Sequence, residues 1–213
     1  MAVRIIIPCV LILFSSFYGL HAQISPNISI GSTITAGSNA SWLSLSGDFA
    51  FGFYPLQTGL YLVGIWFERI PEKTLVWSFK RDLQVERGSL IQLSNAGALE
   101  LTSVNGSNLT IYSGAAAAAS SGTMENEGNF VLRDISSRIL WRSFDSPTDT
   151  LLPGQDLVED QKLYSKKQSS NYSAGDFMLQ MQNDGNLVLS AYHLADPGYW
   201  TTQTIKKECE SNL

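Results

Sequence analysis

Apolar and polar residues alternate with a period of two over much of the chain, and this pattern is typical of β-strands. Three runs are also rich in aromatic and β-branched residues: GLYLVGIWF from Gly59, KTLVWSFK from Lys73 and SRILWRSF from Ser137. Gly, Ser and Asn punctuate them, and helical periodicity is nearly absent. The pattern therefore predicts an all-β domain of many short strands.

Four segments repeat one motif without gaps. Each has a glycine followed by apolar residues at the second and fourth positions, which predicts a β unit with a turn. The segments are SLSGDFAF (44–51), SNAGALEL (94–101), ENEGNFVL (125–132) and QNDGNLVL (182–189).

The last copy predicts a hairpin whose three-residue loop, Asn183 to Gly185, places the glycine in the left-handed conformation. Gln182 then opposes Asn186, and the pairs Met181–Leu187, Gln180–Val188 and Leu179–Leu189 follow along the two strands. Odd-numbered residues would bury one apolar face, whereas even-numbered residues share the other. A two-residue loop would mix the faces.

Four tryptophans are large enough to fill the core of such a domain: Trp66, Trp77, Trp141 and Trp200. Core packing is favoured for them over a platform for stacking sugars. The run of small residues from Ala115 to Ser121 is expected to be a loop or a plain edge strand, because short isolated helices are marginal.

Composition restricts the function. The 213 residues allow one domain, or one domain and part of another. The 14 Lys and Arg residues against 19 Asp and Glu give a net charge of -5, which argues against a nucleic-acid partner. The chain has two histidines and two cysteines, so we expect no catalytic residues, no metal site and no cofactor, and therefore no enzyme.

The first 22 residues carry one early positive charge, an apolar run from Ile5 to Phe14 and small residues up to Ala22, as a secretory signal peptide does. A membrane anchor is the alternative, but it needs about 18 to 20 uninterrupted apolar residues.

Export predicts glycosylation at five N-x-[ST] sequences, which begin at Asn27, Asn39, Asn105, Asn108 and Asn171. Cys209 would remain alone, either in a chain cut from a longer disulfide-bearing protein or as a free thiol.

Long ordered motifs in this chain resemble a known family. SGDFAFGFY, LVGIWFERIPEKTLVW, ENEGNFVL and LWRSFDSPTDTLLPGQ are similar to the extracellular N-terminus of plant G-type lectin receptor-like kinases, which also resembles the S-locus glycoproteins. The resemblance runs from about Asn27 to the end. It implies a bulb-lectin β-prism of three four-stranded sheets with pseudo-threefold symmetry, at residues 23–149. Residues 150–213 would begin a second, incomplete domain of this kind.

The family's mannose site is written Q-x-D-x-N-x-V-x-Y. The last copy supplies Gln182, Asp184, Asn186 and Val188, with Ser190 in place of the tyrosine. The third copy, with Glu125, Glu127, Asn129 and Val131, implies a weaker second site. The two earlier copies depart further: Ser44, Ser46, Asp48, Ala50 and Gly52 in the first; Ser94, Ala96, Ala98, Glu100 and Thr102 in the second.

Two functions stay open. The first is a mannose-type lectin module, in which a carboxylate and two amides bind sugar hydroxyls and a valine covers the C–H face. The second is a degenerate lectin scaffold that recognises a cell-surface protein in defence or self-recognition, with Asp184 and Gly185 serving only the turn. Either protein would be secreted into the apoplast, or held at the plasma membrane within a longer receptor. A homodimer is possible in either case.

Overall fold

The computed structural model describes residues 27–191 and 198–204, and these residues form strands, turns and one short 3-10 helix, η1 (Ser143–Asp145). The strands make four antiparallel sheets of four strands each. The all-β prediction is therefore confirmed.

The sheets are named A to D. Sheet A has the order β1 (Ile28–Ser29), β10 (Ser121–Met124), β11 (Phe130–Arg133), β12 (Ile139–Arg142). Sheet B has the order β2 (Thr33–Thr35), β7 (Leu90–Leu93), β8 (Leu99–Thr102), β9 (Asn108–Tyr112). Sheet C has the order β3 (Trp42–Leu43), β4 (Phe49–Pro55), β5 (Tyr61–Phe67), β6 (Leu75–Ser78). Sheet D has the order β13 (Lys162–Gln168), β14 (Asn171–Met181), β15 (Leu187–Ala191), β16 (Gly198–Thr201).

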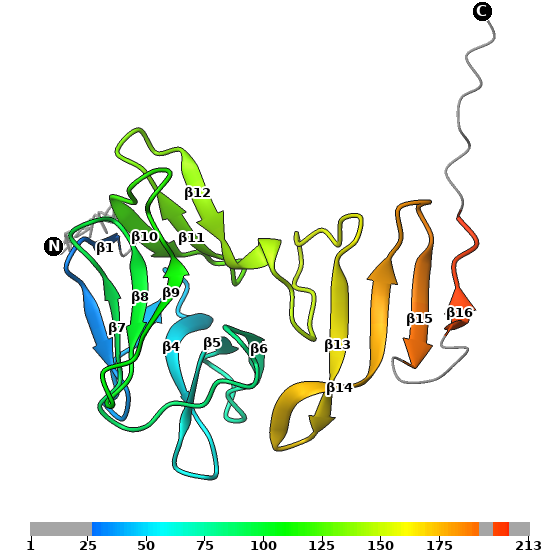
Figure 1. Ribbon diagram of the computed structural model, residues 1–213, viewed down its shortest axis with the longest axis horizontal. Helices are drawn as coiled ribbons and strands as arrows, with labels where there is room; N and C mark the ends of the chain where they lie inside the picture. The colour runs from blue at the N-terminus through cyan, green and yellow to red at the C-terminus, as the bar shows by residue number, and fades with distance from the viewer. Residues whose placement is uncertain (1–26, 192–197, 205–213) are drawn as a thin grey trace, which may run out of the picture.

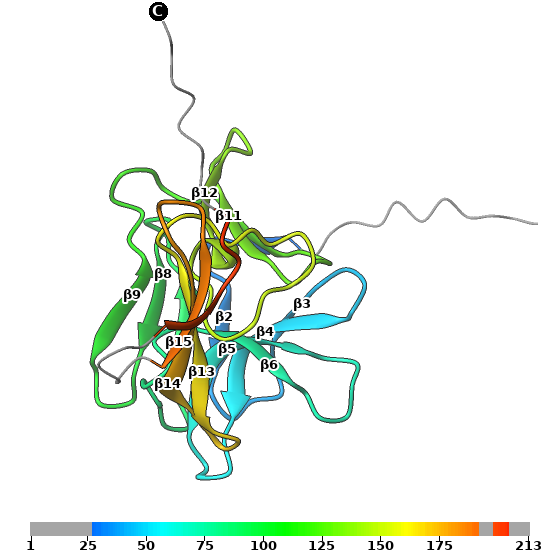
Figure 2. The ribbon, with the colours of Figure 1, turned by 90° about the vertical axis from the view of Figure 1, so that its right-hand side faces the viewer.

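Sheets A, B and C form a prism, and sheet D stands beside it (Figure 1). The first three strands of the chain each join a different sheet: β1 pairs with β10, β2 with β7 and β3 with β4. Figure 2 shows the three sheets on three sides of the molecule, with sheet D toward the viewer. The N-terminal segment thus ties the prism together.

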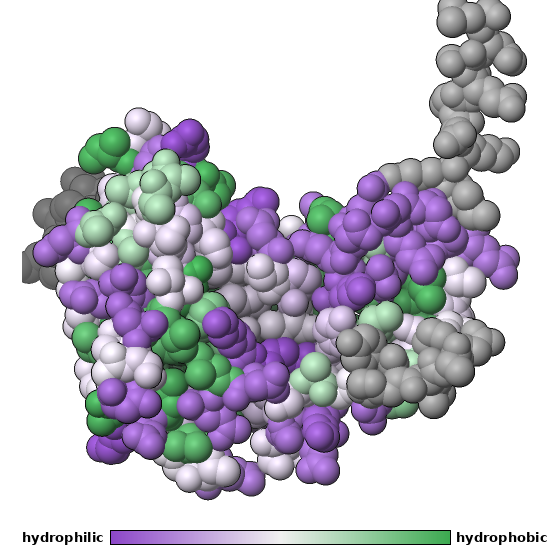
Figure 3. Space-filling model, in the orientation of Figure 1, coloured by the Kyte–Doolittle hydropathy of each residue, from purple (hydrophilic) through white to green (hydrophobic). Residues whose placement is uncertain are grey.

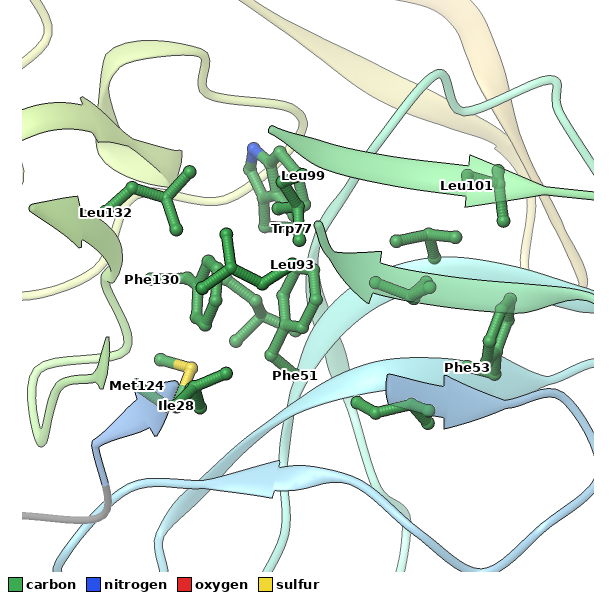
Figure 4. Packing of buried hydrophobic residues seen from close by; sticks show 14 of the residues in the cluster. Ile28, Phe51, Phe53, Trp77, Leu93, Leu99, Leu101, Met124, Phe130 and Leu132 are labelled. Atoms are coloured by element: carbon green, nitrogen blue, oxygen red, sulfur yellow. The ribbon is translucent and has the colours of Figure 1, made fainter. Parts of the chain in front are cut away.

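The prism core lies where the inward faces of the three sheets meet (Figure 4). Phe51 of sheet C stacks on Phe130 of sheet A with ring centroids 4.2 Å apart, and Trp42 stacks on both rings. Leu93 and Leu99 complete the cluster from sheet B. Because each sheet has one apolar face, three sheets together bury what none could bury alone.

The tryptophan prediction is correct for three residues and wrong for the fourth. Trp66 and Trp77 are buried, and Trp141 packs on the core with its ring 5.9 Å from that of Trp77. Trp200 is 50% exposed. It lies in sheet D, and no further described sheet covers it.

The repeated turns share a glycine with positive φ, at Gly47, Gly97, Gly128 and Gly185. In the last three copies the hairpin closes over a three-residue loop, as predicted for the last one. The second copy packs most tightly, because a Cβ on Gly97 would lie 2.5 Å from the backbone nitrogen of Ala119. The predicted loop at Ala115 to Ser121 is confirmed up to residue 120, and it passes over this turn.

The first copy does not align as the sequence suggested. Ser44 bonds to the carbonyl of Phe49, so its loop holds four residues, and the turn joins the edge strand β3 to β4. The turn equivalent to the other three joins β4 and β5, where Leu56 donates to the carbonyl of Leu60 and Gly59 has a φ of +80°. The matching positions in sheet C are therefore Leu56, Thr58, Leu60, Leu62 and Gly64.

Arg81, in the loop after β6, joins the prism to sheet D. Its Nε donates to the carbonyl of Tyr172 at 2.7 Å, its Nη1 to the carbonyl of Tyr164 at 2.7 Å, and its Nη2 lies 3.5 Å from Oδ2 of Asp149. Burial lowers the pKa of Arg81, and the charges of Asp149 and Asp82 oppose that shift. Asp149 is thus half of a nearly buried ion pair.

The outer face of sheet C packs against the same part of sheet D. The hydroxyl groups of Tyr54 and Tyr172 lie 3.3 Å apart, and their rings meet edge to face. Leu56 and Leu62 belong to this second apolar cluster. Leu152 lies beyond residue 149, the predicted end of the first domain, yet it is buried in the prism core. The connection to sheet D therefore begins after Leu152.

Replacing Arg81 should loosen this junction. Arg81→Ala removes one partner of a buried pair and leaves three backbone carbonyl groups without their donor, at a cost of about 3 kcal/mol. Hydrogen exchange should show faster exchange in β13 and β14. The control is Arg138→Ala, which breaks the exposed pair with Asp134 and should cost less than about 1 kcal/mol. Equal effects of the two variants would contradict the role of Arg81.

Candidate functional site

The hairpin β14–β15 has the predicted register. Met181 pairs with Leu187, Gln180 with Val188 and Leu179 with Leu189. The backbone nitrogen of Gln182 donates to the carbonyl of Asn186 at 2.8 Å and closes the three-residue loop. Because side chains alternate along a strand, Gln182, Asn186 and Val188 project from the same face. We call this the outer face of sheet D.

Three predicted site residues line one open groove of about 660 Å³. Gln182, Asn186 and Val188 form one wall, and β16 with the residues after it, through Gln203, forms the other. Polar groups and an aliphatic side chain thus converge on a space within the usual range for small-ligand sites. In Figure 3 hydrophilic residues gather over the part of sheet D where the β14–β15 turn lies.

Asp184 is exposed at the tip of the turn, and Asn186 orients its carboxylate. The backbone N–H of Asn186 donates to Oδ1 of Asp184 at 2.9 Å, and the Asn186 amide donates to Oδ2 at 2.8 Å. These two bonds, the backbone bond first, hold the pKa of Asp184 below its ordinary value of 3.8. Each carboxylate oxygen keeps acceptor capacity for a ligand hydroxyl.

Thr201, which the sequence did not single out, contacts the site from β16. Its hydroxyl donates to Oδ1 of Asn186 at 3.4 Å, and Thr201 pairs with Val188 across the strands. Thr202 and Thr204 hold the same edge: Leu187 N–H donates to the Thr202 hydroxyl, and the Thr204 hydroxyl donates to the carbonyl of Gly185. The sequence feature that could have indicated these contacts is the run TTQT at 201–204, which contains three threonines.

Ser190, at the place of the motif's tyrosine, is only 3% exposed and is not among the residues that line the groove. Its hydroxyl finds no hydrogen-bond partner within the described part of the chain. It pairs with Met178 on one side and Gly198 on the other. Ser190 therefore lies beneath the surface of sheet D and does not extend the wall that Val188 begins.

The third copy has different surroundings. Glu125 bonds to Arg133 at 2.7 Å, and Asn129 is 7% exposed, its side-chain oxygen accepting from the Ser143 hydroxyl and the Phe144 N–H. Val131 is 1% exposed. Glu125 and Glu127 line a separate hollow of about 390 Å³. The two carboxylates are accessible there, whereas the amide and the valine are not.

Four predicted glycosylation positions are exposed: Asn27, Asn39, Asn105 and Asn108. Asn171 is partly buried, and its side-chain oxygen accepts from the N–H of Ser173 at 3.1 Å. The predicted signal peptide and Cys209 lie outside the described residues. Within those residues, no helix has the length and apolarity to cross a membrane.

Residues 74–170 match the model of the family described as D-mannose binding lectin. A G-type lectin S-receptor-like serine/threonine-protein kinase of Oryza sativa subsp. japonica is 40% identical over 205 residues, which is 86% of this chain and 24% of that protein. Over most of its length, the chain is thus related to the plant G-type lectin S-receptor-like kinases. A relative from Arabidopsis thaliana is 36% identical over 200 residues, again 86% of this chain and 24% of the relative.

The chain spans about a quarter of the length of the curated relatives that it matches. The family match ends at residue 170, before the candidate site in β14 and β15. Among solved structures, a lectin from Marasmius oreades is 16% identical with a TM-score of 0.22, covering 84% of this chain and 90% of that one. The prism assignment rests on the sheet topology and not on that likeness.

The pKa of Asp184 should be measurably low. A carbon-detected NMR titration of its carboxyl group should give a midpoint below 3.8, because Asn186 donates to the ionised form. Asn186→Ala keeps the backbone donor and loses the amide, so the pKa should rise part of the way. Any ligand binding that needs the carboxylate should stay constant from neutral pH down to about pH 5 and fall as the pH drops through the lowered pKa. A midpoint above 4 in the parent would contradict this geometry.

Removing the Ser190 hydroxyl should not destabilise the protein. Ser190→Ala deletes a buried hydroxyl that has no described partner, so the free energy of unfolding should stay constant or rise by up to about 1 kcal/mol. Ser143→Ala is the matched control, since the equally buried Ser143 hydroxyl bonds to Asn129 and Phe130 and its loss should cost about 1 to 2 kcal/mol. Denaturant titration compares them, and a larger loss for Ser190→Ala would be the contrary result.

Proposed function

We propose that this lectin domain and sheet D act as an extracellular carbohydrate-binding module for mannose-type glycans, with the binding site on the outer face of sheet D. The observation that supports it is the single groove on which Gln182, Asn186 and Val188 converge beside the oriented carboxylate of Asp184. Amides and a carboxylate match adjacent sugar hydroxyl groups, and the valine suits a C–H face.

The affinity of one such site should be low. Neutral hydrogen bonds contribute about 0.5 to 1.5 kcal/mol each, so a small open site should bind in the millimolar range, near -4 kcal/mol. Useful binding would therefore require several sites presented together. The accessible carboxylates Glu125 and Glu127 are the proposed weaker second site, with Asn129 and Val131 beneath them.

The proposed setting is the apoplast, or the plasma membrane if the chain is part of a longer receptor. Residues 1–22 would be the signal peptide and residues 23–149 the lectin domain, with residues 150–213 beginning a second one. Sheet D supports the last assignment, because its pairing pattern matches that of sheet C strand by strand. Glycans are proposed at the five asparagines, of which four are exposed.

A protein-recognition scaffold is the second candidate function, and the equivalent turns favour it. In sheet C the site positions carry Leu56, Thr58 and Leu60, and Leu56 packs into the cluster that contains Tyr172 of sheet D. In sheet B they carry Ser94, Ala96 and Ala98. Two of the four equivalent turns thus carry apolar or small side chains where the sheet D turn carries amides and a carboxylate. This is expected for a fold whose outer surfaces serve protein contacts.

A glycan array with the parent and Asp184→Ala should separate the two functions. Asp184 is exposed, so its replacement should leave the fold intact, and loss of a hydrogen bond to a charged group, about 1.5 to 3 kcal/mol, should weaken mannose-type binding at least about tenfold. The protein should be displayed multivalently, since single-site binding is weak.

Glu127→Ala is the matched control in the third copy. Unchanged binding of Glu127→Ala beside lost binding of Asp184→Ala would place the site in sheet D, whereas the reverse result would place it in sheet A. No signal from a folded, multivalent parent would reject the lectin proposal and leave the protein-recognition scaffold.

A further inference from the structure

A second hollow lies at the edge of sheet C and shares no lining residue with the groove in sheet D. Its volume is about 430 Å³, within the range of roughly 300 to 1,000 Å³ for small-ligand sites. Residues 37–41 between β2 and β3, residues 53–55 of β4, side chains from β5 and the turn after it, and Arg87 surround it. We call it the sheet C hollow. Leu56 and Leu60, at the site positions of the sheet C turn, do not line it.

Aromatic side chains line this hollow and hold one another in place. The rings of Tyr54 and Trp66 have centroids 5.9 Å apart, and Tyr61 meets Phe53 edge to face at 6.4 Å. The indole Nε1 of Trp66 donates to the carboxylate of Glu68 at 2.6 Å. Because these groups are already ordered, a sugar ring could lay a C–H face on them at little cost in conformational entropy.

The hollow also contains a cation without a partner. Arg87 is exposed, and it makes no hydrogen bond or ion pair with any described residue, whereas Lys73 donates to the Glu68 carboxylate. Gly37 has a φ of +81°, and a Cβ there would lie 2.7 Å from Nε of Arg87. The glycine therefore leaves the space that the guanidinium fills, and the guanidinium keeps its N–H donors for carbonyl or hydroxyl oxygens of a ligand.

One of the five N-x-[ST] sequences, residues 39–41, is part of the wall of the sheet C hollow. Ser38 holds this loop, because its N–H and its hydroxyl both donate to the carbonyl of Thr35. The Asn39 side chain is exposed and has no hydrogen bond within the described residues. Neighbouring residues donate instead to the side-chain oxygens of Asn105, Asn108 and Asn171. Asn39 thus combines a free amide with a place beside an aromatic hollow.

We propose that the sheet C hollow holds the first sugar of an N-glycan on Asn39, so that the chain binds its own N-acetylglucosamine. The inference rests on the extracellular setting proposed above, but not on sugar binding in sheet D. The C–H face of the ring lies on the aromatic side chains, and the N-acetyl carbonyl accepts from Arg87.

The attachment itself is a group transfer from a lipid-diphosphate-linked oligosaccharide. The side-chain nitrogen of Asn39 loses one proton and forms a bond to the anomeric carbon of the sugar. The bond between that carbon and the diphosphate breaks, and the lipid diphosphate leaves. No oxidant or reductant is needed, and the sugar emerges at the wall of the hollow that Asn39 helps to form.

Attachment makes weak binding sufficient. A single sugar in a small open site binds in the millimolar range, because each neutral hydrogen bond contributes little. A group on a short tether is held near its site at an effective concentration that is also in the millimolar range. The attached sugar would therefore occupy the hollow for a large part of the time, whereas a free sugar would rarely fill it.

A peptide strand is a poorer occupant of the same place. β3 already pairs with Ala50 and Phe51 of β4, and Pro55 at the end of β4 has no N–H. The rest of this edge is thus too short to pair with a further strand over several residues. The asparagine in the wall, by contrast, is a point of attachment for a sugar.

Mass spectrometry and NMR test the proposal on the 213-residue chain produced in the secretory pathway of plant cells. The peptide that contains Asn39 should carry a glycan. Trimming with an endoglycosidase that leaves one N-acetylglucosamine on each asparagine then isolates the first sugar. Its N-acetyl methyl signal should shift upfield in the ring currents of the aromatic side chains. The sugar on Asn105, in the exposed turn between β8 and β9, is the internal control and should show no such shift.

Arg87→Ala tests the polar contact, since this side chain has no described partner to lose. In the trimmed protein it should move the Asn39 methyl signal toward that of the control and lower Tm by about 1 to 4 °C. In Asn39→Gln, which carries no sugar at this position, the same replacement should leave Tm unchanged. This non-additivity would report contact between the sugar and Arg87. Asn105→Gln is the matched control for loss of a glycan and should not change the effect of Arg87→Ala.

The outcomes separate this inference from the functions proposed above. Glycans on Asn105 or Asn108 with none on Asn39 would overturn the inference and leave the extracellular setting intact. An unshifted methyl signal at an occupied Asn39, or additive effects of Arg87→Ala and Asn39→Gln, would overturn it as well. A secreted protein without a glycan on any of the five asparagines would contradict both the glycosylation and the inference. The glycan array with Asp184→Ala reports on sheet D alone.

Discussion

The structure depends on one constraint: a four-stranded sheet with one apolar face is stable only when other sheets cover that face. The stack of Trp42, Phe51 and Phe130 meets this constraint at the centre of the prism, where side chains of sheets C and A touch and leucines of sheet B close the cluster. The three short N-terminal strands distribute one edge to each sheet. Removing any one sheet would expose the inward faces of the other two.

The inward faces are therefore fixed by packing, whereas the outer faces are free to diverge. The same three-residue turn occurs at the central hairpin of every sheet. In sheet C its outer positions carry leucine and join the contact with sheet D, with Tyr54 against Tyr172. In sheet A the ion pair between Glu125 and Arg133 lies over buried Asn129. In sheet D they surround an open groove.

How much could be predicted from the sequence follows from the range of each interaction. The register of β14 and β15 was predictable because it depends on a period of two and on a glycine-containing loop, which are both local. The candidate site residues of that hairpin could be placed on one face for the same reason. The first repeat was misaligned because SGDF and QTGL both supply a glycine turn, and only the sheet order distinguishes the edge hairpin from the central one.

The remaining features depend on partners far away in the chain. Trp200 has the residue type and strand register of a core tryptophan, yet its exposure is decided by whether another sheet lies against it. Arg81 bonds to backbone carbonyl groups of Tyr164 and Tyr172, and a backbone acceptor leaves no mark in the sequence. The far wall of the groove comes from β16 because that strand pairs with β15.

The turn and the candidate site of sheet D are not alternatives. In the first copy the N–H of Asp48 donates to the hydroxyl of Ser46 at 3.2 Å, as the N–H of Asn186 donates to Asp184. This bond to the residue two positions earlier serves the turn, because short polar side chains stabilise such turns with it. What Asp184 adds is a second oxygen, to which the Asn186 amide donates at 2.8 Å. The turn and the amide together hold the carboxylate against Asn186, which lines the groove, so a well-formed turn is the precondition for a sugar site at this position.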